Sequence, residues 1–201
     1  MLSSPLRPAV FLDRDGVIIE NRADHVKSIP EVRFIPGALE ALARLAQRKC
    51  FIVIVTNQAA IGRGLLTRQR ADEINAYVLE HITAAGGRID AIYLCPHLPE
   101  EVCVCRKPAP GMLLAATRDL GIDLRASVMI GDALTDIQAA QAVEAQPFLV
   151  RTGRGAVQAQ ELSRIGLINT PTFPSLVEVV DQLLEKDLTA TDFTGSRGSD
   201  R

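Results

Sequence analysis

Hydrophobic residues fall along the chain in two alternating patterns. Short apolar runs such as AVFLD and CFIVIVT are separated by longer segments in which apolar residues recur three or four positions apart. The runs are typical of strands buried on both faces, and the longer spacing is typical of helices with one face on a core. The predicted strands are residues 9–13, 50–56, 90–95, 127–132 and 147–153, and a sixth is indicated near Leu167 and Ile168.

The helical segments have recognisable ends. Thr67 can cap a helix that runs to about Ala85 and stops at a Gly-Gly pair. The predicted helices are residues 37–49, 67–85, 111–120, 134–145 and 175–185. Residues 16–36 lack a helical period and are expected to form an excursion with a hairpin. Because strands alternate with helices, the sequence predicts an α/β fold with a mostly parallel, doubly wound, Rossmann-like sheet and helices on both faces.

The composition agrees with one soluble domain. The chain has 201 residues, of which 47% are hydrophobic and 23% charged, and this suits a single domain over residues 1–188 followed by a polar, disordered tail over residues 189–201. The net charge of −2, the 4% of aromatic residues and the lack of tryptophan argue against nucleic acid or an anionic membrane as partner. Neither an apolar stretch of roughly 18 residues nor a signal peptide is evident, so we expect a cytoplasmic protein, with a monomer as the default.

Polar and charged side chains follow the predicted strands. The carboxyl ends of parallel strands lie at one edge of a sheet, and ligands bind at that edge in doubly wound folds. The side chains expected there are those of Asp13, Asp15, Thr56, Asn57, Arg106, Lys107, Asp132 and Asp136. A single D-x-D pair is common by chance, and it is the series of four groups, each after its own strand, that indicates one functional site.

These residue types suit chemistry on a phosphate. Asp13, Asp15 and Asp132 offer the oxygen ligands that Mg²⁺ prefers, and the cation would offset the repulsion between the carboxylates. The hydroxyl, amide and ammonium groups of the same set are donors for phosphate oxygens. An aspartate can also act as a nucleophile and form an aspartyl-phosphate. The set therefore predicts magnesium-dependent phosphoryl transfer.

A second cluster holds three of the four cysteines. Cys95, His97, Cys103 and Cys105 lie within eleven residues and provide a ligand set for a closed, structural Zn²⁺ site. Reactive thiols are the alternative, but a redox pair is more often C-x-x-C at a helix N-terminus. The loop has little apolar content, so a metal can fix it and thereby position the Arg-Lys pair that follows. Cys50 begins a predicted strand and is expected in the core.

Four stretches resemble the motifs of the haloacid dehalogenase (HAD) phosphatase superfamily. They are FLDRDGVI, VIVTNQ, CRKPAPGM and MIGDALTD, and their order and spacing match over about residues 9–150. Within the superfamily, the chain is most similar to the group of D-glycero-D-manno-heptose 1,7-bisphosphate 7-phosphatases and histidinol-phosphatases. That group has a small or absent cap domain and a zinc loop before Arg-Lys-Pro. The resemblance implies a HAD-type sheet, a minimal or absent cap, catalytic Mg²⁺ and structural Zn²⁺.

The resemblance also implies roles for individual residues. Asp13 resembles the nucleophile and Asp15 the general acid/base, and both would contact Mg²⁺, Asp15 through its backbone carbonyl. Asp132 resembles the third magnesium ligand. Thr56 and Lys107 resemble the groups that hold the transferring phosphoryl group, and Arg106 resembles the residue that recognises a remote phosphate. A sugar pocket would be lined by Asn57, Gln58 and the stretch 21–24, with Asn21, Arg22 and Asp24.

The chain departs from that group at three positions: Val17 replaces a frequent threonine, and the two others bear on the substrate. Ala133 stands where the group usually has lysine, and His25 stands near its usual Gly-Tyr. Ala133 removes a cationic contact for phosphate or substrate. The resemblance thus implies a heptose bisphosphatase, with histidinol phosphate or another small sugar or polyol phosphate as the alternative substrate. A zinc-stabilised binding protein that has lost the reaction is a more distant alternative.

Overall fold

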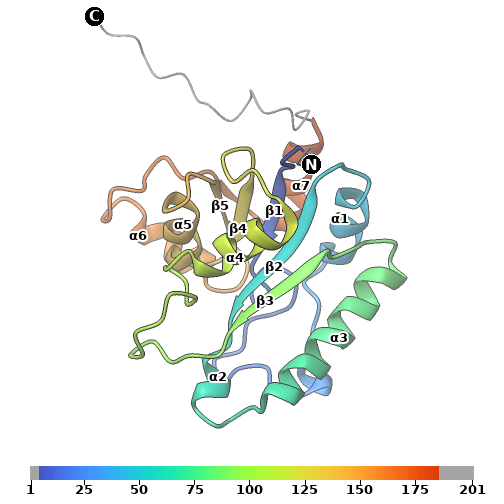
Figure 1. Cartoon of the computed structure of the whole chain (residues 1–201), viewed down its shortest axis with the longest axis vertical. Coiled ribbons are helices and arrows are strands. Elements are labelled where there is room, and N and C mark those ends of the chain that lie inside the picture. Colours follow the sequence, from blue (N-terminus) through green and yellow to red (C-terminus); the bar gives the residue numbers. More distant parts are fainter. Residues whose placement is uncertain (1–4, 186–201) are drawn as a thin grey trace, which may run out of the picture.

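A single parallel sheet forms the centre of the molecule. The computed structural model describes residues 5–185, so the tail predicted over residues 189–201 lies outside the described residues. The sheet has six strands in the order β3-β2-β1-β4-β5-β6, all paired in parallel (Figure 1). The strands are β1 (Ala9–Leu12), β2 (Phe51–Asn57), β3 (Ala91–Cys95), β4 (Val128–Gly131), β5 (Gln146–Val150) and β6 (Thr172–Phe173). This confirms the predicted doubly wound α/β architecture.

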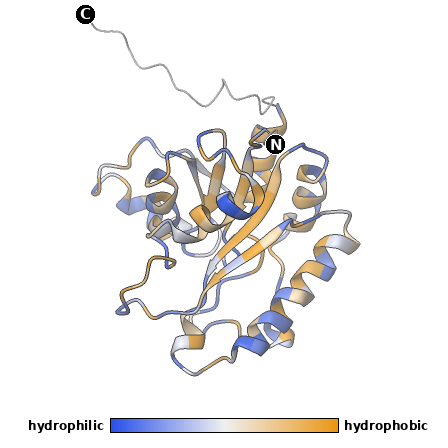
Figure 2. Ribbon diagram, in the orientation of Figure 1, coloured by the Kyte–Doolittle hydropathy of each residue, from blue (hydrophilic) through white to orange (hydrophobic). Residues whose placement is uncertain are grey.

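Helices cover both faces of this sheet. They are α1 (Ala38–Leu45), α2 (Ala59–Gly62), α3 (Arg68–Ala84), α4 (Gly111–Leu120), α5 (Leu134–Gln141), α6 (Gly155–Glu161) and α7 (Leu176–Glu185), with a short 3₁₀ helix, η1 (Ile29–Glu31). Val10 and Leu12 of β1 pack with α1, α3 and α7, whereas Ala9 and Phe11 face α4 and α5. Alternate residues of one strand thus reach opposite cores, and the strands are accordingly hydrophobic over most of their length (Figure 2).

The predicted sixth strand was wrong in position. Leu167 and Ile168 lie in the irregular segment after α6, and the last strand is Thr172–Phe173, which pairs with Leu149 and Val150 of β5. Two residues between prolines are too short to produce an alternating pattern, and this is why the pattern did not reveal β6. The short helices α2 and α6 and the 3₁₀ helix η1 were also missed.

The excursion between β1 and α1 folds back over the carboxyl edge of the sheet. Ile19 forms an antiparallel bridge with Phe34, and the Glu20 N–H donates to Arg33 O at 2.8 Å. The expected hairpin is therefore present as a short pairing rather than as two full strands. The minimal or absent cap remains a prediction.

The strand order places a crevice between β1 and β4. The chain winds outward from β1 to β2 and β3 in one direction, and from β4 to β5 and β6 in the other. Ligands in such sheets bind where the order reverses, beyond the carboxyl ends of the strands. Asp13 follows β1 and Asp132 follows β4, so both lie at this point. No helix within residues 5–185 is long and apolar enough to cross a membrane.

Candidate active site and metal centres

Three buried carboxylates meet at the crevice between β1 and β4. Asp13 and Asp132 directly follow these two strands, and Asp136 lies in the first turn of α5. Each offers an oxygen within 4.8 Å of the others. The Asp13 N–H donates to Ile130 O at 2.9 Å, which continues the β1–β4 pairing and fixes Asp13 beside Asp132. The sequence placed all three residues at this edge but assigned no ligand role to Asp136.

Lys107 is the cation at the centre of this group. Its Nζ lies 3.1 Å from Asp13 Oδ1 and 2.6 Å from Asp136 Oδ1, and it donates to Val55 O at 2.7 Å. Burial lowers the pKa of Lys107, but the carboxylates of Asp13 and Asp136 outweigh burial and raise it above its ordinary value. Lys107 is therefore held in its charged form between the two carboxylates.

The carboxylates carry more negative charge than Lys107 offsets. Burial raises the pKa of Asp136 to about 7, and it also raises the pKa of Asp132, with the Asp13 charge adding to both shifts. Each carboxylate would release its proton more readily beside a further cation. Hard oxygen donors in this number suit a magnesium-sized ion, so the donor set fits the metal that the sequence predicted.

The Asp132 carboxylate packs against two glycines, Gly16 and Gly153. A Cβ built on Gly16 would lie 2.1 Å from Asp132 Oδ2, and one on Gly153 would lie 2.2 Å from the same oxygen. Gly16 also has φ of +93°, which L side chains rarely adopt. Glycine at these two positions is what allows the loops after β1 and β5 to close on the carboxylate.

Asp15 is held apart from the three clustered carboxylates. The Arg14 guanidinium donates to Asp15 Oδ2 at 2.9 Å, and the Gln58 amide donates to the same oxygen at 2.7 Å. Arg14 is fully buried and gives a further hydrogen bond to Asn75 Oδ1 on α3, at 2.7 Å. The Gln58 amide also donates to Thr56 Oγ1 at 2.9 Å, so one side chain joins two predicted catalytic residues.

Sequence reasoning missed both Arg14 and Asn75. A signal did exist, because Asn75 lies on the helix face that also carries Ala71, Ile74 and Val78, and all three of these residues are buried. A polar residue on an apolar helix face must find a partner inside the protein. The partner is 61 positions away in the sequence, so no local pattern could identify it.

Replacing Asn75 with alanine is expected to impair catalysis as well as stability. The variant leaves one Arg14 N–H without its buried acceptor, which costs about 1–3 kcal/mol of the free energy of unfolding. Because Arg14 orients Asp15, we expect kcat to fall by roughly 10-fold or more, with KM changed less. Thermal unfolding and steady-state kinetics of Asn75→Ala and Asn75→Asp test this, since aspartate keeps the acceptor and should restore kcat. Equal kcat in both variants and in the parent would refute the positioning role.

Asn57 has a structural task besides lining the site. The Lys107 N–H donates to Asn57 Oδ1 at 3.1 Å, and Asn57 Nδ2 donates to Lys107 O at 3.0 Å. This reciprocal pair ties the loop after β3 to the end of β2. The sequence assigned Asn57 to the sugar pocket, and the structure adds that it fixes the backbone of the central lysine.

A cavity of ≈ 270 Å³ opens onto this group. The residues that line it are Asp13, Asp15, Asn21, Arg22, Ala23, His25, Asn57, Gln58, Ala59, Arg106, Lys107, Thr135, Asp136 and Arg154. Asp24 is not among them, and its carboxylate instead pairs with Arg22 and Lys27 at the surface. Thr56 is also absent from the lining, since it is buried beneath Gln58. Arg154 and Thr135 line the cavity although the sequence did not select them.

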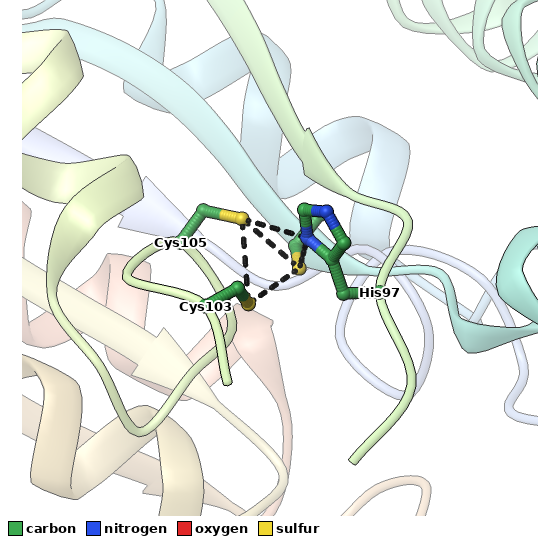
Figure 3. Close-up of side chains that lie close together, drawn as sticks. His97, Cys103 and Cys105 are labelled. Atoms are coloured by element: carbon green, nitrogen blue, oxygen red, sulfur yellow. Dashed lines mark hydrogen bonds between the residues drawn. The ribbon is translucent and has the colours of Figure 1, made fainter. Parts of the chain in front are cut away.

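The cysteine cluster forms a compact four-residue centre. Figure 3 shows His97, Cys103 and Cys105 turned toward a common point, and the ligand atoms of Cys95, His97, Cys103 and Cys105 all lie within 4.8 Å of one another. The Cys105 and Cys95 sulfurs are 3.2 Å apart, and His97 Nδ1 is 3.3 Å from Cys105 Sγ. Tetrahedral sulfur ligands with Zn–S bonds of about 2.3 Å lie roughly 3.8 Å from one another. Cys103 Sγ lies 3.8 Å from Cys95 Sγ and 3.7 Å from Cys105 Sγ, so two of the three sulfur–sulfur distances fit a zinc-sized ion.

The cluster is joined directly to the cations that follow it. The Arg106 N–H points to Cys103 Sγ at 3.4 Å, and the Arg106 guanidinium donates to His97 O at 3.0 Å. Burial raises the pKa of the Cys95 thiol to about 12, so its thiolate form requires a neighbouring cation. A metal here would therefore hold both ends of the loop, with Arg106 directly behind it. Cys50 lies in the core, as expected.

The fold, the carboxylate cluster and the buried lysine together define a HAD-like hydrolase. Residues 104–182 match the family model described as HAD-hydrolase-like. Over 179 residues, 89% of this chain and 99% of the relative, the chain is 37% identical to the D-glycero-β-D-manno-heptose-1,7-bisphosphate 7-phosphatase of Pseudomonas aeruginosa. It is 39% identical to the enzyme of the same name from Escherichia coli K12, over 81% of this chain and 89% of that one.

Solved structures agree with these relatives. The D,D-heptose 1,7-bisphosphate phosphatase of Bordetella bronchiseptica, complexed with magnesium and phosphate, is similar with a TM-score of 0.82 and 37% identity, covering 89% of this chain and 98% of that one. The D,D-heptose 1,7-bisphosphate phosphatase of Burkholderia thailandensis is similar with a TM-score of 0.68 and 33% sequence identity. The match covers 90% of this chain and 100% of that one. The chain belongs to the heptose-bisphosphate phosphatase family of HAD-type phosphatases. It is thus a phosphatase by family, as the sequence predicted.

Proposed function

We propose that this protein is a magnesium-dependent phosphatase that removes the 7-phosphate of D-glycero-D-manno-heptose 1,7-bisphosphate. The observation that carries the proposal is the separation of two aspartates that lie two positions apart. Asp13 belongs to the clustered carboxylates beside Lys107, whereas Asp15 is held by Arg14 and Gln58. This separation supports a role in nucleophilic attack for Asp13 and in proton transfer for Asp15.

The reaction would proceed in two steps. An Asp13 oxygen attacks phosphorus, the bond to the sugar oxygen breaks, and Asp15 gives its proton to that oxygen. Asp15 then takes a proton from water, which attacks phosphorus and breaks the aspartyl-phosphate bond, so Asp13 is restored and inorganic phosphate leaves. Lys107 would hold the phosphoryl oxygens while their charge shifts, and Thr56, which does not line the cavity, would act from behind through its hydrogen bond to Gln58.

Two metals complete the proposed site. Mg²⁺ would be held by Asp13, Asp132 and the backbone carbonyl of Asp15, with Asp136 in the same cluster, and it would neutralise charge on the phosphoryl group. Zn²⁺ would be held by Cys95, His97, Cys103 and Cys105 and would take no part in the reaction. Its role would be to fix the loop that ends in Arg106 and Lys107.

The substrate would extend from Asp13 along the cavity. Arg106 lines that cavity from the end of the zinc loop, where it is suited to a second phosphate. Asn21, Arg22 and Gln58 line it as well and are donors suited to sugar hydroxyls. Their lining positions support the sugar-pocket role that the sequence assigned to them, and Asp24 is left out of the proposal.

A substrate panel tests this function. Phosphate release in the presence of Mg²⁺ would be compared for heptose 1,7-bisphosphate, histidinol phosphate and fructose 1,6-bisphosphate. We expect kcat/KM for the heptose bisphosphate to exceed that for histidinol phosphate by at least ~10-fold, because a guanidinium built for a second phosphate disfavours a substrate that leaves it unpaired. Fructose 1,6-bisphosphate keeps a second phosphate, so a lower kcat/KM for it would report on the sugar pocket. A higher kcat/KM for histidinol phosphate would show that histidinol phosphate is the better substrate. If no phosphate were released from any compound, the proposal that the protein is catalytic would be refuted.

Magnesium is expected to stabilise the protein more at pH 8 than at pH 5.5. The pKa of Asp136 is raised to about 7 from 3.8, so without the metal this carboxyl contributes stability that is lost as pH rises toward 7. Because Mg²⁺ binds the ionised form, its stabilising effect grows over the same interval. In a chain of this length ~1 kcal/mol shifts Tm by about 2–4 °C, so thermal unfolding with and without Mg²⁺ at both pH values resolves it. An equal Mg²⁺-induced rise in Tm at both pH values would contradict the link to the raised pKa of Asp136. The Asp136→Asn variant should show nearly the same rise in Tm at pH 5.5 and pH 8.

A further inference from the structure

Arg154 touches both the carboxylate cluster and the cavity. It lies in the loop after β5, lines the cavity, and has a side chain that is 56% exposed. Its guanidinium Nη2 lies 3.3 Å from Asp132 Oδ1, and its backbone N–H donates to Asp132 Oδ2 at 2.8 Å. The backbone therefore orients the carboxylate, and the side chain covers the oxygen that the backbone leaves free.

The charges around Asp132 indicate that the contact between the Arg154 guanidinium and Asp132 depends on whether a divalent cation is bound. Asp13, Asp132 and Asp136 provide three negative charges, and Lys107 and Arg154 provide two positive ones. A divalent cation on the cluster would bring the total to plus one. Without the Arg154 guanidinium, the same set with the cation is neutral. Lys107 is fully buried between two carboxylates, so Arg154 is the positive group that can leave at small cost.

We propose that the Arg154 side chain competes with the divalent cation for Asp132 and, when the cation binds, turns into the cavity to bind a phosphate group of the substrate. This inference rests on the proposed function for its substrate, but the competition itself does not require turnover. A guanidinium is suited to the task because its planar donors match phosphate oxygens in pairs. Cation and substrate would then strengthen each other's binding by the same factor.

The position of Arg154 supports this role. It reaches the cavity from the β5 side, whereas Arg106 reaches it from the β3 side, and these strands lie on opposite sides of β1. Ala133 offers no charge at the start of α5, so Arg154 is the cationic side chain that the β4–β5 side presents to the cavity within residues 5–185. An anionic substrate in the cavity would thus have a cation on each side.

The test compares Arg154→Met with Arg154→Lys and the parent. Methionine removes the charge but keeps the backbone N–H that orients Asp132, so a change in cation affinity reports on the guanidinium. Arg151→Met is the matched control, because Arg151 is exposed in the same loop but lines a different hollow with Ala156 and Gln160. Titration calorimetry would measure Mg²⁺ binding alone and then with inorganic phosphate as the probe.

We expect Arg154→Met to bind Mg²⁺ alone about 2- to 5-fold more tightly than the parent, as an exposed ion pair is worth at most a few-fold. Phosphate should strengthen Mg²⁺ binding at least about 3-fold less in this variant than in the parent, with Arg154→Lys in between and Arg151→Met unchanged. Unchanged or weaker Mg²⁺ binding in Arg154→Met would overturn the competition, and equal strengthening by phosphate would overturn the phosphate contact. Neither readout depends on hydrolysis, so failure of the substrate panel would affect the proposed function alone.

Discussion

Asp13→Asn is expected to lower kcat by at least ~10³-fold while the protein stays folded. Asparagine keeps the shape of the side chain and can still lie beside Lys107, but its amide cannot form the bond to phosphorus. The change also relieves repulsion within the carboxylate cluster, in which the Asp13 charge contributes to the raised pKa values of Asp132 and Asp136. Thermal stability should therefore be unchanged or higher. Steady-state phosphate release at saturating Mg²⁺ and a thermal melt measure both expectations.

The matched control for that experiment is Asp24→Asn. Asp24 is an exposed aspartate of the nearby excursion, pairs with Arg22 and Lys27, and does not line the cavity. Its replacement should leave kcat within about 2-fold of the parent, since surface ion pairs contribute little. If Asp24→Asn reduced kcat as strongly as Asp13→Asn, or if Asp13→Asn remained active, the nucleophile would have to be sought elsewhere.

Cys103→Ser is expected to release zinc and to lower kcat/KM by roughly 10-fold or more. Loss of the metal frees the loop between β3 and α4, whose end carries Arg106, bonded to the cluster through both its N–H and its guanidinium. Lys107 would move with it, because these two cations are adjacent. Structural zinc sites contribute directly to folding, so Tm should fall as well. Metal content, Tm and kinetics of the purified variant give the three readouts.

Cys50→Ala is the control for the zinc experiment. Cys50 is buried in the core and lies outside the four-residue centre. Its replacement should cost stability without loss of zinc, and kcat/KM should follow the parent. If Cys103→Ser lost zinc but kept both turnover and substrate affinity, the positioning role of the zinc loop would be refuted.

Features that are local in the sequence were predictable. The four proposed zinc ligands lie within eleven residues, and Asp13, Thr56 and Asp132 stand at the ends of short apolar runs. Parallel pairing then brings these ends together, because every strand of a doubly wound sheet points its carboxyl end the same way. These patterns were enough to predict the sheet, the helices on its two faces, the carboxylate cluster and the cysteine cluster.

Features that depend on distant partners were not predictable. The bond between Arg14 and Asn75 joins residues 61 positions apart, and the contact of Arg154 with Asp132 depends on a loop that follows a different strand. Asp13 and Asp15 follow the same strand, but the structure turns Asp15 toward Arg14 and Gln58, and no local pattern in the sequence indicates this. The short helix α6 was missed because GAVQAQE has no clear apolar period.

The most direct test of the account is a ³¹P NMR time course of heptose 1,7-bisphosphate with the enzyme and Mg²⁺. We predict that the signal of the 7-phosphate disappears first and is replaced by inorganic phosphate, while the signal of the 1-phosphate persists after one equivalent has been released. That result would show that the cavity places the 7-phosphate at Asp13 and binds the other phosphate without cleaving it. Loss of the 1-phosphate first, or loss of both at equal rates, would contradict the proposed function.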